Sequence, residues 1–406
     1  MKHHYKSLLL LCLVFLAVGI MFCMNDILLP SLVEHFKMSY FQATMIQFSF
    51  YITYLIFPLP IAWMIHTYGY KNSLLVALFF CTLGCSMFIP AKIFDSYLLV
   101  LTSIFILSTG ITVFNVAANP FLSLLGDPEG SAIRMNFAQV FARVGYATTP
   151  VVATALIYST SGEIRFHVPY ALIAFLIIVI GVLIYFSKMP SMKAEEEDKF
   201  SVKGVFKEVR RFPHLFFGVF AMFFYVGAEA CTAGFFIPYL QESLGFSPSD
   251  ASRYLTLYYI FAGVMCLMAV VILRFVKAHI LVGVYGIAMI ICYLVISLLN
   301  TGYNEFFLAS LGLFLGIMFP TLFSLGIEEV GAFSGRGSAL LNFAIVGGAF
   351  FPPIQGAITD KFGVSISYLV PCFCFLMITI YAFFFTKTPL AKRNFKFKLA
   401  GNSLPD

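Results

Sequence analysis

The sequence has few charged residues. They make up 11% of its 406 residues, whereas hydrophobic residues make up 61%. An ordinary soluble domain has about a quarter of its residues charged. The deficit excludes that class and indicates a protein that is solvated by lipid.

Alternating polar and apolar segments, the pattern of a membrane β-barrel, are also absent, because the apolar residues form long runs. A bilayer core of about 30 Å requires about 20 residues of helix. The runs therefore predict membrane-spanning helices. The first run, Ser7 to Met24, has no small-residue cleavage site after it, and we expect it to be a retained span.

Cysteine and histidine patterns that build disulfide frameworks or metal sites are missing. All nine cysteines lie inside apolar runs, and all seven histidines lie at the ends of runs or between them. We expect no metal and no cofactor. An enzyme would need a nucleophile, a metal cluster or paired acids at one interface, and no such cluster is present, so we expect no enzymatic activity. If a proton is involved, a carboxylate must carry it, since no histidine is placed to do so.

Charged and Pro- or Gly-rich breaks divide the chain into twelve predicted spans. They cover residues 7–32, 41–65, 73–90, 97–123, 134–159, 168–187, 214–240, 251–274, 280–299, 305–327, 338–359 and 365–386. If the amino terminus is cytoplasmic, nineteen of the 25 Lys and Arg residues fall inside, five fall outside, and Arg143 lies within a span. This asymmetry predicts a multi-pass protein of the bacterial inner membrane with both termini cytoplasmic. The net charge of +6 then follows from topology and requires no nucleic-acid partner.

One long polar stretch separates the spans into two groups of six. We expect an amino-terminal six-helix bundle (1–187), a cytoplasmic linker (188–213), a carboxyl-terminal six-helix bundle (214–388) and a cytoplasmic tail (389–406). The linker carries the acidic run Glu195 to Asp198, which is typical of a solvated segment.

The two groups share local sequence. Pro120 to Gly126 ends the fourth span and Pro320 to Gly326 ends the tenth, and Asn136 in the fifth span is matched by Asn342 in the eleventh. Two six-span halves repeated in one orientation are the plan of a major-facilitator transporter, an all-α membrane fold with its solute site between the halves.

Ionisable residues inside spans are costly and therefore indicate function. Asp26 in the first span and Glu229 in the seventh are the candidate proton-coupling residues, although each could instead be a fixed ion-pair partner. Arg143 in the fifth span is the third interior charge.

A polar stripe accompanies these charges, because Asn136, Gln139 and Arg143 share one face of a helix. Amides suit sugar hydroxyls, which both donate and accept hydrogen bonds, although each amide could instead join two helices. The candidate substrate-binding residues are Gln47, Asn115, Asn119, Asn136, Gln139, Arg143 and Asn342.

Four segments together resemble the fucose-galactose-glucose:proton symporters of the major facilitator superfamily: Asn25 to Pro30, Ala117 to Phe121, Arg134 to Gln139 and Tyr225 to Glu229. The resemblance implies uptake of a hexose or deoxyhexose with a proton by alternating access. It also implies that Asp26 matches a carboxylate of the fucose transporters and Asn136 an amide of their sugar site. We expect a monomer whose partners are the sugar, the proton and the bilayer.

The chain departs from that family at several positions. Asn115 stands where the fucose transporters have a second carboxylate, whereas Glu229 stands where they have an amide and looks more like the glucose/galactose branch. Arg143 replaces a small polar residue. It either pairs with Glu229 or Asp26 or binds the carboxylate of an acidic sugar, because a guanidinium suits both. A carrier for acidic or amino sugars, or a sugar sensor that has lost transport, are therefore the alternatives.

Overall fold

The computed structural model describes residues 2–124, 131–158, 164–187, 189, 212–299, 301–328, 330 and 334–386. The described residues are almost entirely helical, and their only β contact is an isolated bridge between Tyr158 and Ile164. Most of the expected linker and all of the expected tail lie outside the described residues.

The amino-terminal half contains nine helices in its described part. They are α1 (Lys2–Phe36), α2 (Tyr40–Ala43), α3 (Met45–Tyr51), α4 (Thr53–Ile56), α5 (Pro58–Ser86), α6 (Phe88–Ile93), α7 (Tyr97–Leu124), α8 (Ser131–Ile157) and α9 (His167–Phe186).

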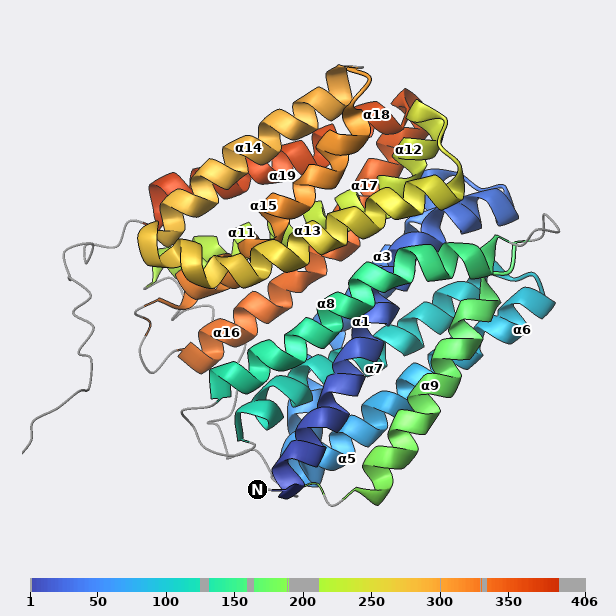
Figure 1. The fold of residues 1–406 in the computed structure, drawn as a ribbon, viewed down its shortest axis with the longest axis vertical. Coiled ribbons are helices and arrows are strands. Elements are labelled where there is room, and N and C mark those ends of the chain that lie inside the picture. The colour runs from blue at the N-terminus through green and yellow to red at the C-terminus, as the bar shows by residue number, and fades with distance from the viewer. Residues whose placement is uncertain are drawn as a thin grey trace, which may run out of the picture.

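The carboxyl-terminal half continues the chain after the linker. Its described helices are α11 (Pro213–Gly234), α12 (Phe236–Leu244), α13 (Pro248–Phe275), α14 (Ala278–Leu298), α15 (Asn304–Ile327), α16 (Ser334–Phe343), η3 (Ala344–Val346), α17 (Gly347–Phe362), α18 (Val364–Ser367), α19 (Leu369–Ile380) and η4 (Tyr381–Phe385). The two halves lie side by side, blue to green and yellow to red (Figure 1).

Eleven helices in the described part are long and apolar enough to cross a membrane, compared with the twelve predicted spans. The second predicted span accounts for the difference, because it is divided among α2, α3, α4 and the start of α5. Gly69, inside α5, has a φ of 79°, and the chain reverses there. The reversal brings Tyr97 back to α2, where its hydroxyl donates to the Gln42 carbonyl at 2.5 Å. The chain therefore makes two crossings between Tyr40 and Ile93.

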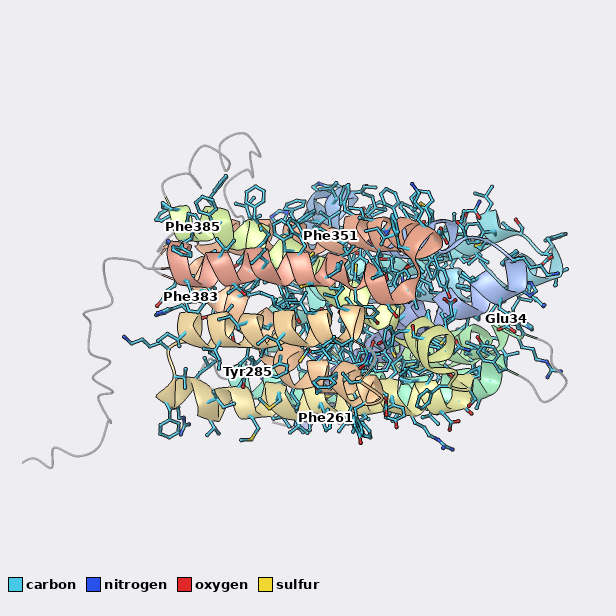
Figure 2. The ribbon with its side chains drawn as sticks, turned by 90° about the horizontal axis from the view of Figure 1, so that it is seen from above. Glu34, Phe261, Tyr285, Phe351, Phe383 and Phe385 are labelled. Carbon is cyan, nitrogen blue, oxygen red and sulfur yellow. The ribbon has the colours of Figure 1, made fainter. Side chains whose placement is uncertain are left out.

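The helices have two common ends. We call the end that holds the start of α1 and the end of η4 the terminal end, and the opposite end, which holds Glu34 and α2, the far end. Phe383 and Phe385 lie near the terminal end and Glu34 near the far end (Figure 2). Lys71 follows the reversal at Gly69 and donates to the Ser187 carbonyl at 2.6 Å, which joins α5 to the end of α9 at the terminal end.

Glycines allow matching helix pairs to pack closely in the two halves. A Cβ on Gly19 of α1 would lie 2.2 Å from the Ala142 carbonyl oxygen of α8, and a Cβ on Gly347 of α17 would lie 1.9 Å from the Phe223 carbonyl oxygen of α11. The first-span and fifth-span pair thus corresponds to the seventh-span and eleventh-span pair. The halves meet where α8 packs on α13 and where α2 and α3 pack on α17.

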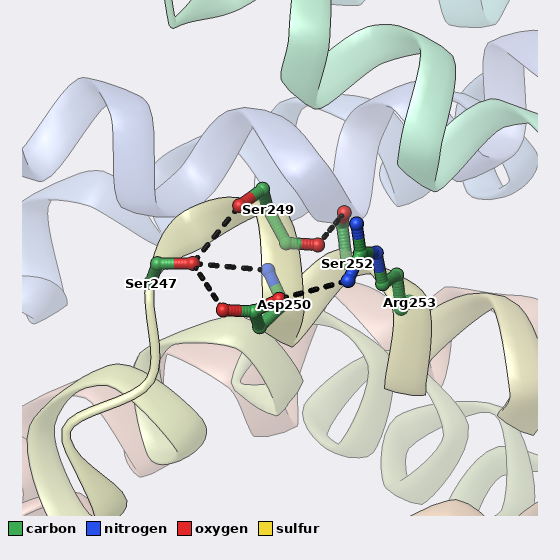
Figure 3. A network of polar contacts seen from close by, with 5 residues as sticks. All are labelled: Ser247, Ser249, Asp250, Ser252 and Arg253. Carbon is green, nitrogen blue, oxygen red and sulfur yellow. Dashed lines mark hydrogen bonds and ion pairs between the residues drawn. The ribbon is translucent and has the colours of Figure 1, made fainter.

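A polar network fixes the start of α13 at the far end (Figure 3). Ser247 is the N-cap, and its hydroxyl oxygen accepts from the Asp250 N–H at 3.2 Å. The Asp250 carboxylate accepts from the Ser247 hydroxyl at 2.7 Å and from Arg253 at 3.1 Å. Because every partner belongs to α13 or its cap, the network stabilises one helix end and does not join the halves.

The close packing predicts that Gly347→Ala destabilises the protein. The added methyl group would overlap the Phe223 carbonyl, and overpacking costs about 1–3 kcal/mol. We expect a lower melting temperature in detergent. Gly181→Ala is the matched control, because a Cβ there would meet only Leu78, at 3.9 Å. Equal melting temperatures for the two variants would contradict close packing at Gly347.

Candidate substrate site

A buried carboxylate joins the two halves near the middle of the protein. Asp26 of α1 is 7% exposed, and the hydroxyl of Tyr259 on α13 donates to its Oδ2 at 2.8 Å. The Tyr259 ring also packs against Tyr146 of α8, with the ring centroids 5.2 Å apart. A buried carboxylate requires such a donor, because an unpaired charge away from water is very costly.

The second carboxylate lies nearby on α11. Glu229 is partly buried, and the Tyr225 hydroxyl, one turn earlier on the same helix, lies within hydrogen-bonding reach of it. The same hydroxyl is 3.2 Å from the Leu315 carbonyl oxygen of α15. Glu229 is also within electrostatic range of Asp26, so the structure brings the two candidate proton carriers into one site.

Arg143 of α8 is the positive member of this site. It lies close enough to Glu229 for electrostatic attraction, and its guanidinium carbon is 5.9 Å from the centroid of the Tyr146 ring, which fits a cation–π contact. Within the described residues it makes no direct ion pair with Glu229 or Asp26. Arg143 therefore interacts with Glu229 electrostatically, without a direct hydrogen bond to the carboxylate of Glu229 or of Asp26 among the described residues.

Gln47 differs from the other predicted amides whose side chains are described, because it is buried without a partner. It is fully buried on α3, and neither its Oε1 nor its Nε2 has a hydrogen-bond partner. Its amide lies against Gly234, where an added Cβ would be 2.8 Å from Nε2. Buried amides are almost always paired, so an unpaired one is a candidate for a polar contact with a solute.

The other predicted amides are either hydrogen-bonded within their own half, exposed, or outside the described side chains. Asn115 donates to the Tyr54 hydroxyl at 2.8 Å. Gln139 is exposed on α8, and Asn342 is exposed and donates to the Ser338 carbonyl of its own helix at 3.0 Å. Asn119 lies in α7 and Asn136 in α8, but their side chains are outside the described residues.

Sequence reasoning did not identify the tyrosines that surround the charges. Tyr259 bonds Asp26, Tyr225 reaches Glu229, and Tyr54 bonds Asn115. Tyr225 stands four residues before Glu229, and this helical spacing could have predicted the contact. Tyr259 had no such signal, because it is 233 residues from Asp26.

Metal ligands and cavities are the other features that could form a site. No group of His, Cys, Asp and Glu in the described residues could hold a metal ion. An apolar cavity of about 210 Å³ lies between α1, α8 and α9. Its lining contains no ionisable residue, so it differs in chemistry from the charged site.

These features define an all-helical membrane carrier with two six-span halves and a polar site between them. The chain matches the family model of the Major Facilitator Superfamily over residues 10–345, and it belongs to that superfamily.

The chain is similar to bacterial sugar transporters over nearly its whole length. It is 33% identical over 401 residues to a glucose/galactose transporter of Brucella abortus, covering 95% of this chain and 96% of that protein. It is 30% identical over 414 residues to the L-fucose-proton symporter of Escherichia coli, covering 93% of each chain. The protein is therefore a sugar transporter of this superfamily and not an enzyme.

Solved structures agree on the fold. A transporter called FucP, crystallised in the outward conformation, has a TM-score of 0.69 at 26% identity and covers 95% of this chain and 100% of its own. A D-xylose-proton symporter has a TM-score of 0.78 at 12% identity and covers 94% of this chain and 98% of its own.

We predict that Gln47→Leu makes the free protein more stable but weakens its binding of sugar. Leucine removes a buried amide that has no partner, an arrangement that costs about 1–3 kcal/mol, so the melting temperature of the free protein should rise. Affinity for the transported sugar should fall by about tenfold, because one polar contact is lost. Melting in detergent and binding of glucose, galactose and L-fucose are the measurements.

Asn304→Leu is the control for this prediction. Asn304 is also a buried amide, but it is fully paired, with Nδ2 donating to Tyr239 at 2.7 Å and to the Leu299 carbonyl at 2.8 Å. Its replacement should lower the melting temperature. If Gln47→Leu melts lower as well and binds sugar normally, Gln47 is a structural residue.

Proposed function

We propose that the protein imports a hexose or deoxyhexose together with a proton by alternating access. The observation that carries the proposal is the group formed by Asp26, Glu229 and Arg143, which sits between the halves. Asp26 and Glu229 are the groups that exchange the proton, and a sugar binds beside them.

The names of the relatives support the substrate class. One relative is called a glucose/galactose transporter and another an L-fucose-proton symporter. The unpartnered amide of Gln47 and the tyrosines around the carboxylates supply donors and acceptors for sugar hydroxyls. Asn115, Asn119, Asn136, Gln139 and Asn342 complete the set of proposed substrate contacts.

We place the terminal end in the cytoplasm, because the lysines and arginines concentrate there in the predicted topology. The cross-half hydrogen bonds of the described residues join the far end and the middle of the protein: Asp360 with α2, Tyr40 with Glu242, and Tyr259 with Asp26. Gln139 and Asn342, on the terminal-end parts of α8 and α16, are exposed. On this orientation the far-end contacts close the outer end of the protein.

The second candidate function is transport of an acidic or amino sugar such as a sialic acid, a uronate or an N-acetylhexosamine. Arg143 favours it, because the guanidinium has no direct carboxylate partner among the described residues. A bidentate guanidinium is the group best suited to a sugar carboxylate.

Glu229→Gln should abolish accumulation of sugar against its gradient. Glutamine keeps the shape and hydrogen bonding of the side chain but cannot release a proton, so exchange of labelled sugar across vesicles should be partly retained. Uptake is measured with and without an imposed pH gradient. Glu305→Gln, at the first turn of α15, is the control and should accumulate sugar normally. Full accumulation by Glu229→Gln would remove Glu229 from coupling.

Arg143→Ala distinguishes the two substrate classes. If Arg143 binds a sugar carboxylate, uptake of sialic acid or a uronate should be lost, by about tenfold or more, while uptake of glucose, galactose and L-fucose is retained. If Arg143 instead tunes Glu229, proton-driven uptake of every sugar should change together. Unchanged uptake of all substrates would exclude both roles.

A further inference from the structure

A cluster at the far end holds the two halves together. Asp360, at the end of α17, accepts from the Tyr40 N–H at 2.7 Å and from the Phe41 N–H at 2.9 Å. These are the first residues of α2, so a carboxylate of one half binds the amino-terminal end of a helix in the other. The free N–H groups at the start of a helix favour a hydrogen-bond acceptor at this position.

Two further contacts join the same surfaces. The Tyr40 hydroxyl donates to the Glu242 carboxylate of α12, and the Tyr40 ring packs on Phe235, with the ring centroids 5.6 Å apart. Gly356, one turn before Asp360 on α17, lets the backbones approach, because a Cβ there would lie 2.8 Å from the Tyr40 carbonyl oxygen.

Each side of this cluster is anchored in its own half. The short helix α2 has a capping box between Ser39 and Gln42, and the Gln42 carbonyl accepts from Tyr97 of α7. On the other side, Ser243 of α12 bonds Ser365 of α18 at 2.8 Å. A change at the contact is therefore transmitted to whole helices and is not absorbed by a loose loop.

We infer that Asp360, Gly356, Tyr40 and Glu242 form a far-end latch, whose closure sets the balance between the two access states. The latch is separate from the substrate site. Asp360 is a positioning residue that acts through α2, and only Thr44 separates α2 from α3, which carries Gln47. Opening the latch should therefore move α3 away from α11 and expose the site at the far end.

The position of the latch makes it sensitive to small changes. Asp360 is exposed to solvent, so its hydrogen bonds are only modestly stabilising, and the contact can break in each transport cycle. A two-state equilibrium responds to differences of this size, since about 1.4 kcal/mol changes a population ratio tenfold.

Spin labels at two pairs of positions test the latch in the full chain. Phe94→Cys with Phe362→Cys reports the distance between the halves at the far end, and Phe186→Cys with Phe275→Cys reports it at the terminal end. All four side chains are at least two-thirds exposed. Eight native cysteines are buried, and the ninth, Cys266, is replaced by serine in every variant.

Asp360→Asn is the main variant, because it keeps the size of the side chain but removes its charge and one acceptor. We expect the ratio of far-end-open to far-end-closed molecules to rise about tenfold, with a matching shortening of the terminal-end distance. Gly356→Ala should shift the ratio in the same direction without changing any charge, and it supports the latch independently if Asp360→Asn fails to fold.

Asp250→Asn is the matched control. Asp250 is also a far-end carboxylate at a helix start, but its partners all belong to α13 and its cap (Figure 3). It should leave both distance distributions unchanged. The latch is overturned if Asp360→Asn and Gly356→Ala both resemble the parent protein, or if Asp250→Asn opens the far end as much as Asp360→Asn does.

Discussion

The cost of placing charge in a lipid-solvated protein organises this structure. An isolated charge in hydrocarbon is so unfavourable that each interior ion must find a partner or water. Asp26 accepts a hydrogen bond from the Tyr259 hydroxyl. Glu229 lies within reach of the Tyr225 hydroxyl and is attracted by the positive charge of Arg143. These partners come from α1, α8, α11 and α13, so both halves contribute to holding the three charges inside the protein.

The contacts inside each half differ in kind from the contacts between the halves. Inside each half, glycines such as Gly19 and Gly347 bring helix backbones into contact, and such packing does not depend on water. Between the halves, the contacts include tyrosine hydroxyls, carboxylates and backbone N–H groups. Polar contacts of this kind can be exchanged for water at low cost, which suits the proposed alternating access.

Much of the architecture could be predicted from the sequence, because a helix that crosses lipid must be long and apolar wherever it lies. The predicted bounds of the fourth span, 97–123, differ from α7 by one residue. The second span was harder to define, since its breaks at Thr44 and Ile52 carry no proline, glycine or charge to mark them. Only the break at Phe57 is marked, by Pro58 at the start of α5. The reversal at Gly69 lies between the second and third predicted spans, 41–65 and 73–90.

The site was predictable for its charges and less so for their partners. Asp26, Arg143 and Glu229 stand out because the surrounding spans contain almost no other ions. Gln47 was one amide among several, and only the fold shows that it is fully buried without a partner. Tyr259 was indistinguishable from the other 20 tyrosines of a chain that has 21, since its role depends on a contact between helices far apart in sequence.

The net charge of the site depends on how many protons it holds and on the charge of the substrate. With both carboxylates ionised, Asp26, Glu229 and Arg143 sum to one negative charge, and one bound proton makes the group neutral. A neutral sugar added to that state leaves it neutral, so one proton is enough to remove the net charge from a site that must pass through a low-dielectric interior. An acidic sugar brings another negative charge and would need a second proton for the same result. If the proposed proton coupling holds, we expect one proton per neutral sugar and two per acidic sugar, because the positive charge of Arg143 already offsets one of the two carboxylates.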